Sequence, residues 1–311
     1  IVIAYLSWKA VIKPPPVAEI SPAETQAQAG ENTVHTPVPS STQGDFERRR
    51  LCYTFLLVAS DQASANADTI MVLTYDTAEQ MAGLVSIPRD TLVDRRFPKI
   101  NAVYHDGIEA LRDEVSRMLG IPIDYYICVD VDGFVQVVDA VDGIDFDVPI
   151  HMAYDDPLQD LHIHFEPGMQ HINGKEALAI CRLRKNSDGT MAYPDSDIGR
   201  TRTQQQLLAA IAKKLLANPQ KIFEYIDLWK QYVTTDLKAE HIAWFASSLL
   251  NFPLETALSF ETLPGDGTVK YKELEWCYEL YPEEVLEIVN GMLNPYTKPL
   301  TGQDLNIFQV K

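Results

Sequence analysis

Residues 173–216 read NGKEALAICRLRKNSDGTMAYPDSDIGRTRTQQQLLAAIAKKLL, and we expect the rest of the chain to be organised around this stretch. It predicts two helices separated by a polar loop, with these arginines at the loop-facing ends: Arg182, Arg184, Arg200 and Arg202. A helical residue advances about 100° per step, so one stripe of the second helix contains Arg200, Gln204, Leu207 and Ile211. Its apolar members are expected to pack inward, which turns Arg200 toward the interior. An inward arginine needs an anionic partner, either a protein carboxylate or a ligand phosphate.

Composition narrows the function classes. The chain has 311 residues, a net charge of -18 and 46% hydrophobic residues, which allows one large domain or two small ones. The acidic balance argues against general nucleic-acid binding, because such binding needs a basic surface. Four scattered cysteines form no CxxC pair: Cys52, Cys128, Cys181 and Cys277. They are predicted to be small buried residues rather than zinc ligands, with one disulfide as the alternative if the protein is exported.

The N-terminal region predicts a tether. Residues 1–12 begin IVIAYLSW, which is apolar but shorter than the roughly 20 residues that cross a membrane. They are interpreted as the outer end of a truncated transmembrane anchor, with a short strand or frayed end as the alternative. Residues 13–49 are rich in Pro, Ala, Ser and Thr and predict a disordered stalk. The folded domain is expected from residue 50 to residue 311.

Strand-like and helical segments alternate beyond residue 50. Strands are expected at 52–60, 68–76, 82–88, 124–131, 144–150 and about 256–263. Besides the two arginine-bearing helices, further helices are expected at 107–120, 219–233, 241–250 and 282–293. Asp132 is expected to cap a short helix that follows the fourth strand. The alternation predicts an α/β fold, a three-layer α-β-α domain with a central mixed sheet.

Two further groups of residues carry candidate chemistry. The segment SIPRDT places Arg89 and Asp90 just past the end of an apolar strand, where ligands gather in open α/β sheets. Asp61 ends one expected strand and Asp68 begins the next, so a hairpin would bring their carboxylates together. Paired hard oxygen ligands suit Mg²⁺. Taken singly, each feature also fits a solvated loop or a turn.

Other site patterns give less. His162 and His164 alternate along an expected strand, and this HIH segment is interpreted as a surface feature rather than a metal site. The sequence contains no HExxH, Walker or GxGxxG pattern, and no Ser/His/Asp arrangement stands out. A hydrolase triad and a nucleotide-binding fold are therefore not supported.

Several fragments, taken in order, resemble the LytR-CpsA-Psr family of cell-wall phosphotransferases, over about Leu51 to Pro295. The matching pieces are DTIMVLTYD, SIPRDT, KINAVYHDG, GIPIDYYICVDVDGFVQVVDAVDGIDFDVP, GMQHINGKEALAICRLR and DIGRTRTQQQLLAAI. The resemblance implies a membrane protein anchored by one N-terminal helix, with its domain on the extracytoplasmic side. It also implies transfer of a phosphate-linked glycopolymer, of the teichoic acid or capsular polysaccharide type, from a polyprenyl pyrophosphate carrier to peptidoglycan.

Residue roles follow from the same resemblance. Asp61 and Asp68 would hold Mg²⁺ on the pyrophosphate, and Asp90 would order the arginine cluster. The residues expected to clamp the pyrophosphate oxygens are Arg89, Arg182, Arg184, Arg200 and Gln204. Arginine suits this task because its planar fork binds phosphate oxygens through two hydrogen bonds.

Three positions depart from the family pattern. Ala63 and Asn66 stand in a loop where the family often has arginines, and Thr203 stands where an arginine usually precedes the glutamines. Arg202 cannot take the place of an arginine at position 203, because it lies about 200° from Arg200 around the helix. The departures leave open weaker pyrophosphate binding, a different carrier, or a catalytically weak lipid-pyrophosphate-binding or regulatory protein of the cell envelope. Hydrolysis of the pyrophosphate, with water as acceptor, is a third hypothesis.

Overall fold

The computed structural model describes residues 13–18, 46–61, 66–156, 161–194, 197–218, 221–250 and 252–310. The expected anchor at 1–12 and most of the expected stalk lie outside these residues. Residues 13–18 have no regular secondary structure and lie against the domain, where the Tyr53 hydroxyl donates to the Pro15 carbonyl at 3.0 Å. Among the described helices, none combines the length and the apolar character that a membrane crossing requires.

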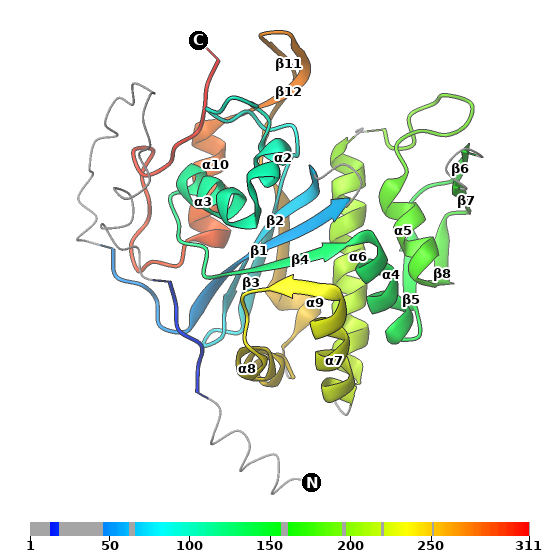
Figure 1. Ribbon diagram of the computed structural model, residues 1–311, viewed down its shortest axis with the longest axis horizontal. Helices are drawn as coiled ribbons and strands as arrows, with labels where there is room; N and C mark the ends of the chain where they lie inside the picture. Colours follow the sequence, from blue (N-terminus) through cyan, green and yellow to red (C-terminus); the bar gives the residue numbers. More distant parts are fainter. Residues whose placement is uncertain are drawn as a thin grey trace, which may run out of the picture.

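A six-stranded sheet forms the centre of the fold (Figure 1). Its strands, in order across the sheet, are β10 (Leu258–Thr262), β3 (Met81–Ile87), β2 (Asn66–Asp76), β1 (Cys52–Asp61), β4 (Tyr125–Asp130) and β9 (Val233–Thr235). Strand β1 runs antiparallel to β2 and parallel to β4, and β3 runs parallel to β10. The sheet is therefore mixed, as predicted.

Helices cover both faces of this sheet, which confirms the three-layer prediction. One face packs against α2 (Ile100–Val103), α3 (Ile108–Leu119) and α10 (Pro282–Ile288), which continues into η4 (Val289–Leu293). The other face packs against α8 (Ala239–Leu249) and α9 (Leu254–Ala257). Strand β1 packs against helices on both faces of the sheet because its side chains alternate between the two faces. Leu56 lies in the largely aliphatic cluster on one face. Phe55 lies in the aromatic cluster on the other face, where its ring centroid is 5.1 Å from that of Phe245.

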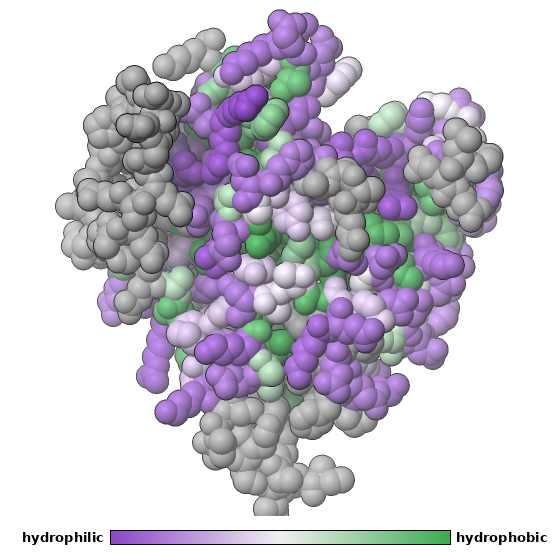
Figure 2. Space-filling model, in the orientation of Figure 1, coloured by the Kyte–Doolittle hydropathy of each residue, from purple (hydrophilic) through white to green (hydrophobic). Residues whose placement is uncertain are grey.

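A second packed region lies beside the sheet. Its helices are α4 (Val131–Ala140), α5 (Gly174–Arg182), α6 (Asp197–Ala217) and α7 (Ile222–Tyr232). Two ribbons complete it, β5 (Ile144–Val148) with β8 (Gly168–Ile172), and β6 (Met152–Asp156) with β7 (Leu161–Phe165). A separate apolar cluster, including Val138, Ile180 and Leu207, holds the region together. Figure 2 shows hydrophilic side chains over much of the coloured surface, with intermediate and hydrophobic areas between them.

Three findings differ from the sequence interpretation or add to it. The α4 cap is Asp130, whose side chain accepts from the Gly133 amide at 2.7 Å, and the predicted cap Asp132 is wrong. The physical reason is that β4 ends at Asp130 and α4 begins at the next residue, so no loop separates them. The hairpin of β11 (Gly265–Tyr271) and β12 (Leu274–Leu280) was not predicted, because most of its residues are partly or fully exposed and give no apolar period. All four cysteines are free.

Candidate functional site

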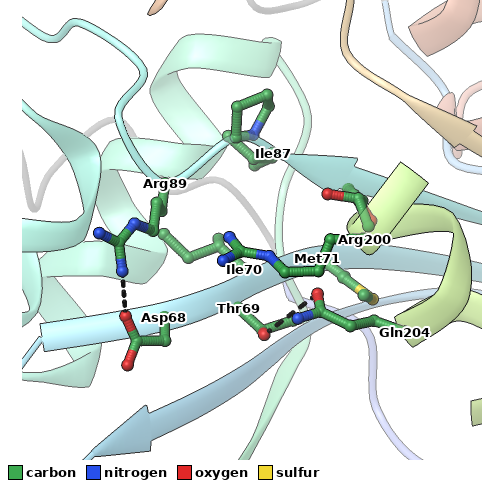
Figure 3. Close-up of a pocket in the computed structure, with 11 residues that line it drawn as sticks. Asp68, Thr69, Ile70, Met71, Ile87, Arg89, Arg200 and Gln204 are labelled. Atoms are coloured by element: carbon green, nitrogen blue, oxygen red, sulfur yellow. Dashed lines mark hydrogen bonds and ion pairs between the residues drawn. The ribbon is translucent and has the colours of Figure 1, made fainter. Parts of the chain in front are cut away.

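A narrow pocket opens where β2, β3 and α6 meet (Figure 3). Its lining residues are Asp68, Thr69, Ile70, Met71, Ser86, Ile87, Pro88, Arg89, Arg200, Thr201 and Gln204. The cavity volume is about 10 Å³, which is the space of one water. The pocket is therefore too small to enclose a phosphate group.

A β-bulge places Asp68 at the opening of this pocket. The register of β1 against β2 shifts after Ala59, which leaves Asp68 as the extra residue on β2. Bulges redirect side chains and are common beside active sites. The Asp68 side chain is 46% exposed, and its Oδ1 atom accepts from Arg89 Nη1 at 2.5 Å.

The turn after β3 supplies Arg89 and Asp90, as the strand-end argument predicted. Arg89 Nε lies 3.7 Å from Asp90 Oδ2, and the other oxygen of Asp90 pairs with Lys99 Nζ at 2.9 Å. Asp90 therefore lies between two cations, Lys99 and the Arg89 that also pairs with Asp68. Sequence reasoning missed Lys99, although it begins the KINAVYHDG piece that matched the family.

Helix α6 confirms the predicted inward stripe. Arg200 is 7% exposed and Leu207 is fully buried, whereas Arg202 is exposed. Figure 3 shows the Arg200 side chain extending from α6 over β2 toward Arg89. Gln204 follows on the same stripe, where its Oε1 accepts from Thr69 Oγ1 at 3.5 Å. Two cations from distant segments therefore meet at one pocket.

Arg182 and Arg184 are not among the residues that line this pocket. Helix α5 ends at Arg182, so Arg184 lies just beyond the helix instead of in its last turn, and both side chains are exposed. Cys181 joins the helix end to the pocket, since its carbonyl accepts from Gln204 Nε2 at 3.3 Å. Burial raises the pKa of the Cys181 thiol to about 12, and the opposing charges of Arg200 and Arg182 reduce this shift. The thiol is therefore protonated at neutral pH.

Some of the expected metal ligands, and some of the positions that depart from the family pattern, lie outside the described residues. The Asp61 side chain and the whole of Ala63 lie outside the described residues. Asn66 Oδ1 lies 3.0 Å from His105 Nε2. The Thr203 hydroxyl donates to the Gly199 carbonyl at 3.0 Å, within the helix. Thr203 therefore forms a local hydrogen bond and contributes no cation.

Gln205 is a further residue that the sequence reasoning did not assign. Its side chain is 4% exposed, and its Nε2 donates to Ser86 Oγ at 2.9 Å and to the Glu261 carbonyl at 2.8 Å. These bonds tie α6 to β3 and β10. Beyond Gln205 lies a second cavity, of about 410 Å³, lined by Ile198, Arg202, Gln205, Phe260, Glu261, Thr262, Leu263, Pro264 and Tyr278.

Known proteins resemble this chain in sequence and in fold. A model of the LytR_cpsA_psr family matches residues 21–292. The polyisoprenyl-teichoic acid–peptidoglycan teichoic acid transferase TagV of Bacillus subtilis is 34% identical over 190 residues, which are 58% of this chain and 47% of TagV. The transferase TagU of Bacillus licheniformis is 31% identical over 227 residues, which are 70% of this chain and 69% of TagU. The chain thus spans about half the length of the TagV relative.

A solved structure has the same architecture. The crystal structure of Bacillus subtilis TagV superposes with a TM-score of 0.66 at 25% sequence identity. The superposition covers 77% of this chain and 95% of the TagV structure. The match therefore extends over most of the folded region, including both of its packed parts.

Proposed function

Because the chain belongs to the LytR_cpsA_psr family, we propose that it transfers a phosphate-linked glycopolymer from a polyprenyl pyrophosphate carrier to peptidoglycan. The polymer class is teichoic acid or capsular polysaccharide. The observation that carries the proposal is the meeting of Arg89 and the buried Arg200 at one pocket, with Asp68 beside them. Two relatives named as transferases between a polyisoprenyl-linked teichoic acid and peptidoglycan support the substrate class.

Phosphoryl transfer requires the protein mainly to supply positive charge and to position the reactants. A peptidoglycan hydroxyl oxygen attacks the phosphorus that carries the polymer, and the bond from that phosphorus to the bridging oxygen breaks. Polyprenyl phosphate leaves with the electron pair, and the hydroxyl proton passes to solvent. Negative charge grows on the bridging oxygen, so preorganised cations lower the barrier. Arg89 and Arg200 supply this charge at the pocket mouth, and Asp90 holds Arg89 in place.

Asp68 fits a magnesium ligand. Carboxylate oxygens are the hard donors that Mg²⁺ prefers, and Asp68 is exposed at the mouth of the pocket. In this proposal Asp68 and Asp61 hold the ion, which would neutralise pyrophosphate charge when bound. Two carboxylates are too few ligands for a tight site, so tight Mg²⁺ binding requires pyrophosphate oxygens as well.

The same proposal places the domain outside the cytoplasmic membrane. Peptidoglycan and an exported lipid-linked polymer meet there, and an apolar N-terminal segment followed by a Pro-rich stalk would tether the domain at that surface. In this arrangement Arg182, which directly follows the Cys181 bonded to Gln204, and Arg184 are exposed and would turn toward a bound pyrophosphate to supply further positive charge.

One experiment separates the enzyme from the binding protein. The purified chain is given a polyprenyl-pyrophosphate-linked polymer, peptidoglycan oligomers and Mg²⁺, and both lipid binding and polymer attached to peptidoglycan are measured. We expect attachment that requires Mg²⁺ and a release of polyprenyl phosphate in equal amount. Lipid binding without attachment would favour the catalytically weak binding protein. Release of free polymer with water as acceptor would favour the hydrolase.

A further inference from the structure

A second group of ligand-type side chains lies on the β6–β7 ribbon, away from the arginine pocket. Asp155 Oδ1 lies 2.5 Å from His162 Nδ1 and 3.0 Å from His164 Nε2. The three potential ligand atoms all lie within 4.8 Å of one another, and all three residues are exposed. Of the described residues, this is the one group of three that meets this criterion.

The fold fixes this grouping. Asp155 pairs directly with His162 across the two strands, and His164 lies two residues further along the same face. Side chains two apart on a strand share a face, so all three project to the same side. Ala153 stands opposite His164, and its small side chain leaves Asp155 free to reach the second imidazole.

The opposite face of the ribbon holds the register in place. Met152 and Ile163 are fully buried in the apolar cluster of the second region. A slip of one residue would expose them and bury the histidines, so the register is strongly specified. The Asp155 amide also donates to Ser187 Oγ at 2.9 Å, which ties the ribbon to the loop after α5.

We propose that Asp155, His162 and His164 form a binding site for a divalent transition metal, with Zn²⁺ as the expected ion. Two imidazoles and one carboxylate are a donor set that Zn²⁺ takes with three protein ligands and one open position. Ligand atoms around tetrahedral zinc lie about 3.3 Å apart, so these exposed side chains need only small rotations. The site excludes Mg²⁺, which selects oxygen ligands. The inference does not depend on the proposed transferase activity.

The chain contains its own matched controls. His171 Nδ1 lies 2.8 Å from Asp145 Oδ1, and His151 Nδ1 lies 3.1 Å from Glu166 Oε2. Each is an exposed histidine beside one carboxylate, without a second imidazole in the group. Loss of either therefore removes a comparable surface pair and leaves the three-ligand site intact.

The test is calorimetric titration of the tag-free chain with Zn²⁺ and, separately, with Mg²⁺. We expect one Zn²⁺ per chain, no Mg²⁺ bound at this site, and an affinity for Zn²⁺ that falls about tenfold or more in His162→Ala, His164→Ala and Asp155→Asn. His171→Ala should bind as the unmodified chain does. Equal affinity in all five proteins would overturn the proposal, as would binding at millimolar Zn²⁺ only.

A spectroscopic measurement and a thermal one distinguish loss of the metal site from misfolding of a variant. Co²⁺ in place of Zn²⁺ should give visible absorption from a site of mixed nitrogen and oxygen ligands in the unmodified chain and in His171→Ala. Thermal unfolding should shift upward with Zn²⁺ in the same two proteins only, because binding to the native state alone stabilises it. An upward shift of the same size in His162→Ala would contradict the assignment.

Discussion

The two sides of α6 differ in almost every property that matters for binding an anion. One side carries the buried Arg200 and faces a charged pocket of about 10 Å³. The other carries the exposed Arg202 and faces a cavity of about 410 Å³ with both apolar and polar walls. Gln205 separates the two by bonding to β3 and β10. Two arginines that lie two positions apart in sequence therefore have different surroundings.

The largest expected effect is on stability, and it tests whether the inward stripe of α6 packs in the core. Leu207→Ala should lower the free energy of unfolding by about 2–5 kcal/mol, because it leaves a hole in the second core. The exposed neighbour Gln206 provides the control, and Gln206→Ala should change stability by no more than about 0.5 kcal/mol. Denaturant unfolding measures both. Equal effects would mean that α6 does not present the face described here.

The next effect concerns catalysis on that same stripe. Arg200→Ala should reduce polymer transfer by about 10²–10³-fold, as loss of one preorganised donor does elsewhere. Arg200→Lys keeps the charge but loses the planar fork, so it should recover only part of the rate. Transfer is compared after thermal unfolding shows that each variant is folded. An Arg200→Ala protein with unaltered transfer would remove Arg200 from the site.

A smaller effect should follow from introducing the arginine that the family resemblance leads us to expect at position 203. Side chains on a helix lean toward its N-terminus, so Thr203→Arg would extend toward the pocket end of α6. A regained charge-assisted hydrogen bond should tighten binding of a prenyl pyrophosphate by about tenfold. Thr203 is 2% exposed, so the larger side chain should also cost about 1–3 kcal/mol of stability.

Thr203→Met is the matched control for this variant, because it adds length without charge. It should lose similar stability and gain no affinity. Calorimetric titration with a prenyl pyrophosphate distinguishes the two variants, and equal affinities would show that position 203 does not reach the pyrophosphate.

The smallest effect is expected on the outward side. Arg202→Ala should change pyrophosphate binding less than about twofold, because the exposed side chain lines the other cavity and surface charges are screened by solvent. If Arg202→Ala weakened pyrophosphate binding as much as Arg200→Ala, the contrast between the two sides of α6 would be lost. If it raised KM for peptidoglycan alone, the larger cavity would become the candidate acceptor site.

The sequence alone was enough to locate the elements with a clear apolar period and to say which of their faces is buried. Apolar periods located β1 to β4, α3 and α6, since burial of one face imposes the same spacing on any fold that contains it. The helical spacing of 100° per residue predicted that Arg200 points inward and that Arg202 points away from it. The ends of apolar strands pointed to Arg89 and Asp68 as candidates, and the family resemblance gave them their expected roles.

Only the tertiary structure decided which of these side chains meet. The bulge at Asp68 depends on how β1 and β2 pair, and Lys99 reaches Asp90 from the start of α2. The same holds for the β6–β7 ribbon, where the sequence shows His162 and His164 but not the carboxylate between them. Asp155 lies opposite His162 because of strand register, which is set by burial of the other face. Contacts between distant segments arise from packing, and no local pattern in the chain encodes them.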